Sequence, residues 1–393
     1  HRILIQIVAR LSPRLSRYRW RSLCACASVA HAVLERNPRP DSSVSVNPLG
    51  RGPTEERLEM IDKVFSSVYR IGSPCGDNYG YLVLKRDGRI MYSHSINEST
   101  WEYTSGNLRL KNEEGVITSE YRYIEDYNTW IGNHYLKLYP MYLMPVLQYC
   151  LGAPVVHNNS VVINCIPKSG THLMHKLMLE IGYADAMVML TGVDTVDDFQ
   201  YEDIRILGSA SGSRGRICPL PAAVSALPSG YVIVGHIASR ECYTAAHISQ
   251  IKILNCVRNL RDTLISLYRW KLNRRTDDLD LSEFFLFLKY EARPDLDLIK
   301  SCVVNILDNW VGPLFRYEDM MDESRTSEIS MLLSGVLSVH EGIIKDAIER
   351  SRNAITHTYN VKHSCFTDFW DSKIETLFEG IGFSVLNEAL GYE

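Results

Sequence analysis

The fold is decided by the stretch Val161-Val162-Ile163-Asn164-Cys165-Ile166-Pro167-Lys168-Ser169-Gly170-Thr171-His172-Leu173-Met174. Its first part, 161–166, is apolar and rich in β-branched residues, which predicts a buried strand. Apolar residues then recur at helical spacing, at Leu173, Met174, Leu177, Met178 and Ile181. This spacing predicts an amphipathic helix. The residues between them are therefore expected to form a tight loop that joins a strand to the first turn of a helix.

The loop 167–172 has the features of an anion-binding turn. Gly170 lets the backbone approach a ligand closely, and the hydroxyls of Ser169 and Thr171 lie where the first helical N–H groups are unpaired. Lys168 adds a positive charge to the positive end of the helix dipole. Lys168 precedes the glycine rather than following it, unlike the lysine of a nucleotide triphosphatase loop, so ordinary ATP or GTP hydrolysis is disfavoured.

A second strand–helix junction favours anion binding over the alternative, a purely structural turn of the kind common in α/β folds. Residues 251–257 predict another short strand, which leads into Arg258 and a predicted helix. Arg258 falls at the strand exit, where open α/β sheets bind ligands. Asp262 lies early in the helix and Ser266 one turn later on the same face. An arginine with a hydroxyl is suited to holding a second phosphate.

Together the two stretches resemble the sulfotransferases that use 3′-phosphoadenosine 5′-phosphosulfate (PAPS). In that family Pro-Lys-Ser-Gly-Thr-Thr/His-Trp/Leu holds the 5′-phosphosulfate. A second motif, Arg-Asn-Pro-x-Asp with a serine four residues after the aspartate, holds the 3′-phosphate. Both patterns occur here in order, with Leu260 in place of the proline, and the resemblance covers roughly residues 158–393. It implies that the cofactor is bound by Lys168, Ser169, Gly170, Thr171, His172, Arg258 and Ser266.

The same resemblance assigns two further residues. A strand predicted at 231–237 ends in a His-Ile step, as in many sulfotransferases, and this implies that His236 is the catalytic base. A structural histidine is the alternative. Tyr317 begins a Tyr-Glu-Asp-Met step that implies a place near the adenine; a buried tyrosine at a strand end is its alternative. In this reading His236 takes the proton of the acceptor hydroxyl, while Lys168 and the loop N–H groups stabilise the departing phosphate without a metal.

The C-terminal part matches the family least. The family pattern Arg-Lys-Gly-x-x-Gly-x-Trp closes over the cofactor, but the corresponding stretch 360–370 keeps only Lys362 and Trp370. The arginine and both glycines are missing. This segment is therefore not included in the predicted site.

Composition limits the other possibilities. The chain has 42 Lys and Arg against 46 Asp and Glu, a formal net charge of −4, so a nucleic-acid partner is not expected. No apolar run approaches the ~18 residues of a membrane helix. The cysteines lack metal-ligand spacing and several fall in apolar strands, which favours reduced thiols over a disulfide framework. Reduced thiols in turn favour a cytoplasmic location.

Changes in composition predict three segments. Residues 1–57 have no acidic residue before Glu35 and are later broken by proline and glycine, which predicts a poorly structured leader, either a transit peptide or translated upstream sequence. Residues 58–140 alternate and carry a hairpin signal at Asp87-Gly88, which predicts a small antiparallel β module. Its aromatic residues either stack on a sugar or fill a small core. Residues 140–157 are expected to connect this module to the sulfotransferase domain at 158–393, in which 191–228 is expected to be a long loop near the acceptor.

The sequence thus predicts an α/β chain in which a β module precedes a three-layer, P-loop-type domain with a central parallel sheet. The predicted function is sulfuryl transfer from PAPS to an acceptor hydroxyl on a saccharide or another small cell-surface precursor. Two alternatives stay open: a P-loop phosphotransferase that uses ATP, and a catalytically silent nucleotide-binding protein of the same fold.

Overall fold

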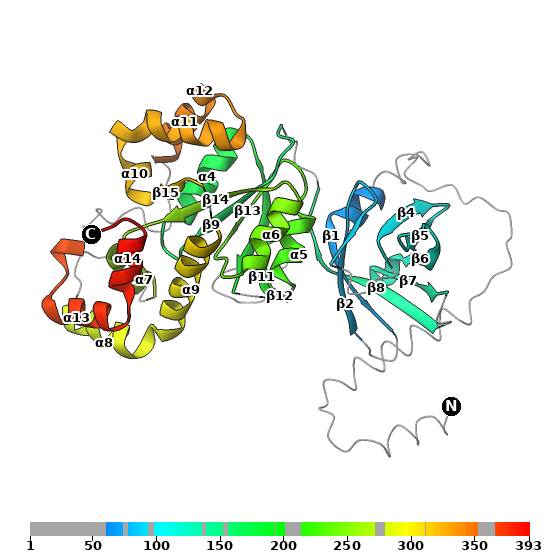
Figure 1. Cartoon of the computed structure of the whole chain (residues 1–393), viewed down its shortest axis with the longest axis horizontal. Helices are drawn as coiled ribbons and strands as arrows, with labels where there is room; N and C mark the ends of the chain where they lie inside the picture. Colours follow the sequence, from blue (N-terminus) through cyan, green and yellow to red (C-terminus); the bar gives the residue numbers. More distant parts are fainter. Residues whose placement is uncertain are drawn as a thin grey trace, which may run out of the picture. The chain divides into compact units, whose positions relative to one another are not determined.

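The computed structural model describes residues 60–73, 78–92, 98–135, 139–151, 156–192, 194–200, 214–271, 280–310, 312–352 and 366–393. The chain divides into two compact units, residues 1–148 and residues 149–393 (Figure 1). The predicted leader at 1–57 and Lys362 lie outside the described residues.

The described part of the first unit is an antiparallel sheet that nearly closes on itself. Its strand order is β3-β2-β1-β8-β7-β6-β5-β4, and a bridge between Arg89 and Thr100 joins the two ends of this order. The predicted hairpin at Asp87-Gly88 is confirmed, because Val83 of β2 pairs with Met91 of β3. The strands are β1 (Ser67–Gly72), β2 (Asn78–Leu84), β3 (Ile90–Met91), β4 (Thr100–Thr104), β5 (Asn107–Lys111), β6 (Ile117–Ile124), β7 (Thr129–His134) and β8 (Tyr139–Gln148), with a short 3₁₀ turn at Glu125–Tyr127.

Two features of this unit differ from or refine the sequence-based expectation. The stretch expected to begin a connection at 140 is instead the longest strand, β8, which pairs with both β1 and β7. Tyr121 and Trp130 are almost fully buried among aliphatic side chains such as Leu82 and Leu108. These two aromatic residues therefore fill a core, the simpler of the two roles left open by the sequence.

The second unit contains a mixed sheet of seven described strands in the order β12-β11-β10-β13-β9-β14-β15. The predicted parallel sheet is found in five of them, because β10, β13, β9, β14 and β15 pair in parallel. β11 and β12 extend the sheet with antiparallel pairing. The strands are β9 (Val161–Cys165), β10 (Ala184–Thr191), β11 (Thr195–Asp198), β12 (Arg214–Ile217), β13 (Tyr231–Gly235), β14 (Lys252–Val257) and β15 (Leu314–Arg316).

The expectation of a long loop at 191–228 was wrong for its described residues. They form β11, β12 and the helix α5. Val196 is buried between the neighbouring strands, and the buried carboxylate of Asp198 pairs with Arg216 at 2.6 Å. Burial of an apolar residue and a paired charge on these short strands outweighs the turn-forming composition that suggested a loop.

Helices cover both faces of the mixed sheet (Figure 1). On one side α4, α11 and α12 pack together; on the other, α6 contacts β14, α5 and α9. The helices are α4 (Thr171–Ile181), α5 (Leu220–Ala226), α6 (Arg240–Ile248), α7 (Leu260–Lys271), α8 (Leu281–Leu286), α9 (Arg293–Asn309), α10 (Tyr317–Met321), α11 (Thr326–Leu337), α12 (Glu341–Arg352), α13 (Ser372–Gly380) and α14 (Phe383–Ala389). Short 3₁₀ or π turns lie at Phe287–Glu291, Glu323–Arg325 and Phe366–Asp368.

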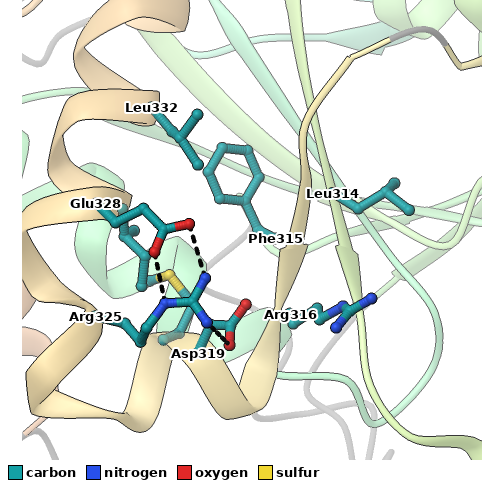
Figure 2. Close-up of a pocket in the computed structure, with 9 residues that line it drawn as sticks. Leu314, Phe315, Arg316, Asp319, Arg325, Glu328 and Leu332 are labelled. Carbon is teal, nitrogen blue, oxygen red and sulfur yellow. Dashed lines mark hydrogen bonds and ion pairs between the residues drawn. The ribbon is translucent and has the colours of Figure 1, made fainter. Parts of the chain in front are cut away.

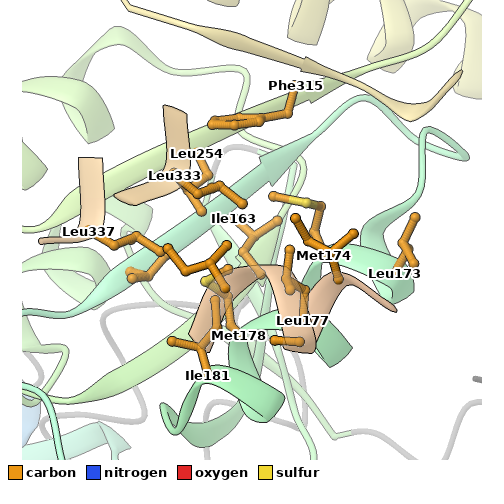
Figure 3. Close-up of a cluster of buried hydrophobic side chains, with 14 of the residues drawn as sticks. Ile163, Leu173, Met174, Leu177, Met178, Ile181, Leu254, Phe315, Leu333 and Leu337 are labelled. Carbon is orange, nitrogen blue, oxygen red and sulfur yellow. The ribbon is translucent and has the colours of Figure 1, made fainter. Parts of the chain in front are cut away.

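One apolar cluster fixes α4 to the sheet (Figure 3). Alternate residues of β9 point to the same face, so Ile163 meets Leu177 and Met178 of α4, with Leu333 of α11 and Phe315 of β15 in the same cluster. Full burial of each such side chain contributes about 1.5–3 kcal/mol. Because β9 and α4 are both held by this cluster, the loop between them has two rigid ends.

None of the helices within the described residues is both long enough and apolar enough to cross a membrane.

Candidate active site

The predicted site residues follow four neighbouring strands of the mixed sheet. The order β13-β9-β14-β15 is continuous, and all four strands run in parallel. His236 follows β13, the loop 166–170 follows β9, Arg258 follows β14, and Tyr317 follows β15. The carboxyl ends of parallel strands meet at one edge, which is where open α/β sheets bind ligands. The structure therefore brings these residues to a common edge.

The loop after β9 has a special backbone. Lys168 has a φ of 68° and Gly170 a φ of 101°, both in the left-handed region. Gly170 is the N-cap of α4, and no side chain caps this end of the helix. The N–H groups in the first turn of a helix have no intrahelical partner and point out of its N-terminus, so this end of α4 favours an anion.

The N-terminus of α7, by contrast, is closed by protein groups. The N–H of Leu260 donates to Asn387 Oδ1 at 2.8 Å, and the N–H of Arg261 donates to Asn259 Oδ1 at 3.0 Å. The N–H of Asn259 donates to Glu318 Oε1 at 3.1 Å. These caps were not found from the sequence, because Glu318 and Asn387 are distant along the chain. They leave the Arg258 side chain, rather than the helix end, as the group that can hold an anion at this motif.

Lys168 is held at both its backbone and its side chain. Arg258 Nη1 donates to the Lys168 carbonyl at 3.3 Å, and the Lys168 ammonium lies 5.1 Å from the centre of the Trp270 ring. Burial, reinforced by the positive charge of Arg258, lowers the pKa of Lys168 to about 8. The ammonium is thus short of compensating negative charge, which is the state expected of a group that receives an anion.

Ser169 has a different environment from the one expected of a ligand. Its side chain is buried, and its hydroxyl lies 2.6 Å from the carbonyl of Ile166 and 3.0 Å from that of Cys256. The hydroxyl proton is therefore used to tie the loop to β14. Thr171 is half-buried at the start of α4, and His172 is exposed. The binding roles of these three residues stay predictions.

Tyr317 joins the two motifs. The Arg258 guanidinium carbon lies 4.5 Å from the centre of the Tyr317 ring, and the same ring packs on Gly170. A Cβ added at Gly170 would lie 2.6 Å from Tyr317 Cδ2, too close for any real contact. Burial raises the pKa of the Tyr317 hydroxyl. The Tyr317 ring therefore contacts both Arg258 and the loop at Gly170, and its place near an adenine stays a prediction.

Replacing Gly170 by alanine is expected to displace the loop. The new Cβ meets the Tyr317 ring and the residue must keep a φ of 101°, so we expect a loss of about 1–3 kcal/mol in the free energy of unfolding. Denaturant unfolding measures it. Gly192→Ala is a matched control, because Gly192 has a φ of 69° but nothing within 4 Å of the added Cβ. Equal losses in the two variants would contradict a role for the Tyr317 contact.

His236 is held in one orientation. Its Nδ1 lies 2.7 Å from the carbonyl oxygen of Cys165, and because a carbonyl only accepts, Nδ1 carries the proton. Its backbone N–H donates to the Leu190 carbonyl at 3.0 Å. The next residue, Ile237, donates its N–H to Asn164 Oδ1 at 2.9 Å. This tautomer leaves Nε2 with a lone pair that can take a proton.

A buried polar network supports this segment. Asn164 of β9 donates to Asn255 Oδ1 of β14 at 2.8 Å, and the Tyr243 hydroxyl of α6 donates to the same oxygen at 2.8 Å. Asn305 of α9 donates to the Ile237 carbonyl at 3.1 Å. Fully buried side-chain hydrogen bonds of this kind fix geometry in a low-dielectric interior. They were missed in the sequence, where Asn164 and Asn255 are isolated polar residues within apolar strands.

The electrostatics of His236 suit a base. Burial lowers its pKa, the hydrogen bond to the Cys165 carbonyl opposes this, and the Lys168 charge lowers it further. The imidazole is therefore neutral near pH 7.

Asp262 and Ser266 lie half-buried on α7. Burial raises the pKa of Asp262, whereas the nearby Arg258 charge lowers it. The role of Asp262 in the second motif stays a prediction. The side chain of Ser266, one turn further along, makes no hydrogen bond to another residue that the structure describes, and its contact with a phosphate stays a prediction.

Trp370, which the sequence aligns with the tryptophan of the family's C-terminal lid, is partly buried and packs against the core. Its ring packs edge-on against Phe366 and Phe378, in the apolar cluster formed with α7 and α9. Its indole N–H donates to Glu375. This supports leaving Trp370 outside the site.

A cavity in the described part of the chain lies away from these residues. It has a volume of about 280 Å³ and lies between β15 and α11 (Figure 2). Arg325, which pairs with Asp319 at 3.2 Å and with Glu328 at 2.6 Å, closes one side of an apolar floor that includes Phe315. The lining contains none of the predicted site residues, so this cavity has no part in the proposed chemistry.

No protein-family model and no curated protein matches the chain. Sulfotransferases are among the solved structures that it resembles. The mouse sulfotransferase SULT7A1, complexed with PAP, is 15% identical, with a TM-score of 0.36 over 61% of this chain and 90% of that one. Retinol dehydratase, in complex with androsterone and the inactive cofactor PAP, is 14% identical, with a TM-score of 0.35 over 68% and 89%. The sulfotransferase domain of the Synechococcus PCC 7002 olefin synthase is 13% identical, with a TM-score of 0.30 over 62% and 99%.

Proposed function

We propose that this chain is a sulfotransferase that moves a sulfuryl group from PAPS to the hydroxyl of an acceptor. The observation that carries the proposal is the contact between its two anion-binding motifs. Arg258 at the exit of β14 donates to the carbonyl of Lys168 in the loop after β9, and Tyr317 packs against both segments. Two phosphate-holding groups at adjacent strand ends suit a ligand with two separate phosphates.

The residues present fit such a nucleotide. The uncapped N-terminus of α4 and Lys168 would receive the phosphosulfate end, and Arg258 with Ser266 would receive the 3′-phosphate. Arg258 Nε is buried and, among the described residues, has no hydrogen-bond partner. A buried N–H donor left without a partner costs about 1–3 kcal/mol, which a bound phosphate would recover. PAPS supplies an activated sulfuryl group; the protein supplies position and charge.

The chemistry assigned to the protein is proton transfer and charge stabilisation. The neutral His236 accepts the acceptor proton at Nε2, while its Nδ1–H stays on the Cys165 carbonyl. The Lys168 ammonium and the first N–H groups of α4 stabilise the negative charge that develops on the leaving phosphate. The same strand edge thus holds a base and a positive charge in separate roles.

Calorimetric titration with 3′-phosphoadenosine 5′-phosphate (PAP), without metal and beside ATP with Mg²⁺, tests the cofactor class. We expect micromolar binding of PAP and at least tenfold weaker binding in Arg258→Ala, because a charge-assisted hydrogen bond contributes about 1.5–3 kcal/mol. Arg350→Ala is the control; Arg350 is half-exposed and pairs with Glu180 at 2.8 Å on the outer end of α4. Absent PAP binding, or preference for ATP, would contradict the proposal and favour a phosphotransferase or a silent fold.

The acceptor class is proposed from the sequence alone as a saccharide or another small cell-surface precursor. A panel of hydroxyl-bearing saccharides, steroids, phenols and amines, assayed with radiolabelled PAPS, identifies it.

A further inference from the structure

Trp270 is an exposed aromatic residue beside the proposed site. Its side chain lies in the last turn of α7 and is 54% exposed, although a tryptophan is highly buried on average. The Lys168 ammonium lies 5.1 Å from the centre of its ring. A cation within about 6 Å of an indole face is attracted by the negative face of the ring. The exposed ring thus has a specific partner in the phosphate loop.

Trp270 also continues the row of site residues along α7. Asp262, Ser266 and Trp270 are spaced four residues apart, so they lie on one face of the helix. Arg258, just before the helix, binds the Lys168 carbonyl, and Trp270, at its end, contacts the Lys168 ammonium. Arg258, before α7, and Trp270, in its last turn, therefore contact the backbone and the ammonium of the same lysine.

We propose that Trp270 is a positioning residue for Lys168. The indole face of Trp270 holds the Lys168 ammonium at the phosphate loop before the nucleotide binds. This inference rests on the proposed function for its role in nucleotide binding. A free lysine side chain loses rotamer entropy when it is fixed. A lysine already held by Trp270 loses less of it when a phosphate arrives, so affinity increases by pre-organisation.

A second cation shares the Trp270 ring and provides the control. The Lys271 ammonium lies 5.2 Å from the ring centre, but it also pairs with Asp295 of α9 at 3.1 Å. Lys271 is therefore held independently of Trp270. Removing it changes the charge near the ring without affecting the phosphate loop.

A double-mutant cycle on PAP affinity tests the role of Trp270. We expect Trp270→Leu to weaken PAP binding about threefold to tenfold, and Trp270→Phe to weaken it less, because phenylalanine keeps an aromatic face. In a Lys168→Met background Trp270→Leu should change the affinity by less than about twofold, since the two residues then share no interaction. Lys271→Met should leave the effect of Trp270→Leu unchanged. An undiminished effect of Trp270→Leu without Lys168 would assign Trp270 a merely structural role and overturn the proposal.

Fluorescence of the free protein tests the contact without any ligand. Subtracting the emission of Trp270→Phe from that of the unmodified protein isolates the Trp270 signal. We expect this signal to change as pH rises through about 8, where Lys168 loses its proton, and to be constant in Lys168→Met but not in Lys271→Met. Among the described residues, the other charged or titratable groups around the contact include Arg258 with Asp262, His236, and Lys271 with its partner Asp295.

The two experiments separate the two hypotheses. If the protein fails to bind PAP but shows the Lys168-dependent fluorescence change, the proposed function is disproved and the contact between Lys168 and Trp270 is supported. If the protein binds PAP but shows neither coupling between Trp270 and Lys168 in the double-mutant cycle nor the fluorescence change, the proposed function stands and the role of Trp270 is disproved.

Discussion

Replacing Lys168 by methionine is expected to lower the rate of sulfuryl transfer by about 100-fold or more, the loss typical for a donor aimed at developing charge. Methionine keeps much of the apolar length of lysine but cannot stabilise the leaving phosphate. Transfer of radiolabelled sulfate from PAPS measures the loss. Lys176→Met is the matched control, because Lys176 lies on α4, the helix that follows the loop, and pairs with Glu180 at 2.7 Å on the helix surface.

The pH profile gives the same prediction a second readout. The pKa of Lys168 is about 8, so the ammonium is lost as pH rises through this value. We therefore expect kcat/KM, which reports the free enzyme, to fall above about pH 8. Lys168→Met should remove this alkaline limb together with most of the activity. A variant that keeps the limb would show that another group titrates there and that Lys168 is not the stabilising charge.

The common edge of the site could be predicted because its signals are local. The strand before Pro167, the loop around Lys168 and the junction at Arg258 each occupy fewer than fifteen residues. Hydrophobic periodicity fixes the strand and helix types at that scale, and the parallel arrangement follows from strand–helix alternation. His236 and Tyr317 then fall at strand ends for the same reason. Their roles needed a family resemblance, because a histidine or tyrosine at a strand end is usually structural.

The contacts that tune the site could not be predicted, since they join distant parts of the chain. The sequence around Ser169 predicts that its hydroxyl binds a ligand, yet this hydroxyl lies against the Cys256 carbonyl, 87 positions away. Trp270 carried one usable signal, its spacing of four from Ser266, but nothing local pairs it with Lys168. The strands at Thr195–Asp198 and Arg214–Ile217 were missed because short strands with acidic residues and glycine resemble loops until their partners are known.

Replacing His236 by asparagine is expected to lower transfer by about 100-fold to 10,000-fold, the usual contribution of a general base. Asparagine is chosen because its amide can still donate to the Cys165 carbonyl, the structural bond that His236 makes at 2.7 Å. It has no group that can accept the acceptor proton at the position of Nε2. Transfer of radiolabelled sulfate measures the loss, calorimetry with PAP should show affinity changed by less than about threefold, and His247→Gln, on the exposed end of α6, is the control.

The acid side of the pH profile distinguishes a base from a structural histidine. Burial and the Lys168 charge lower the pKa of His236, so its neutral, proton-accepting form persists below pH 6.5. Activity should therefore fall only as pH drops below about 6.5, the ordinary value for histidine. Residual activity of His236→Asn should lack this acid limb, because the group that titrates is gone. If the variant lost activity but kept the limb, or lost PAP binding in parallel, His236 would be holding the strand end through Cys165 and Asn164 rather than taking a proton.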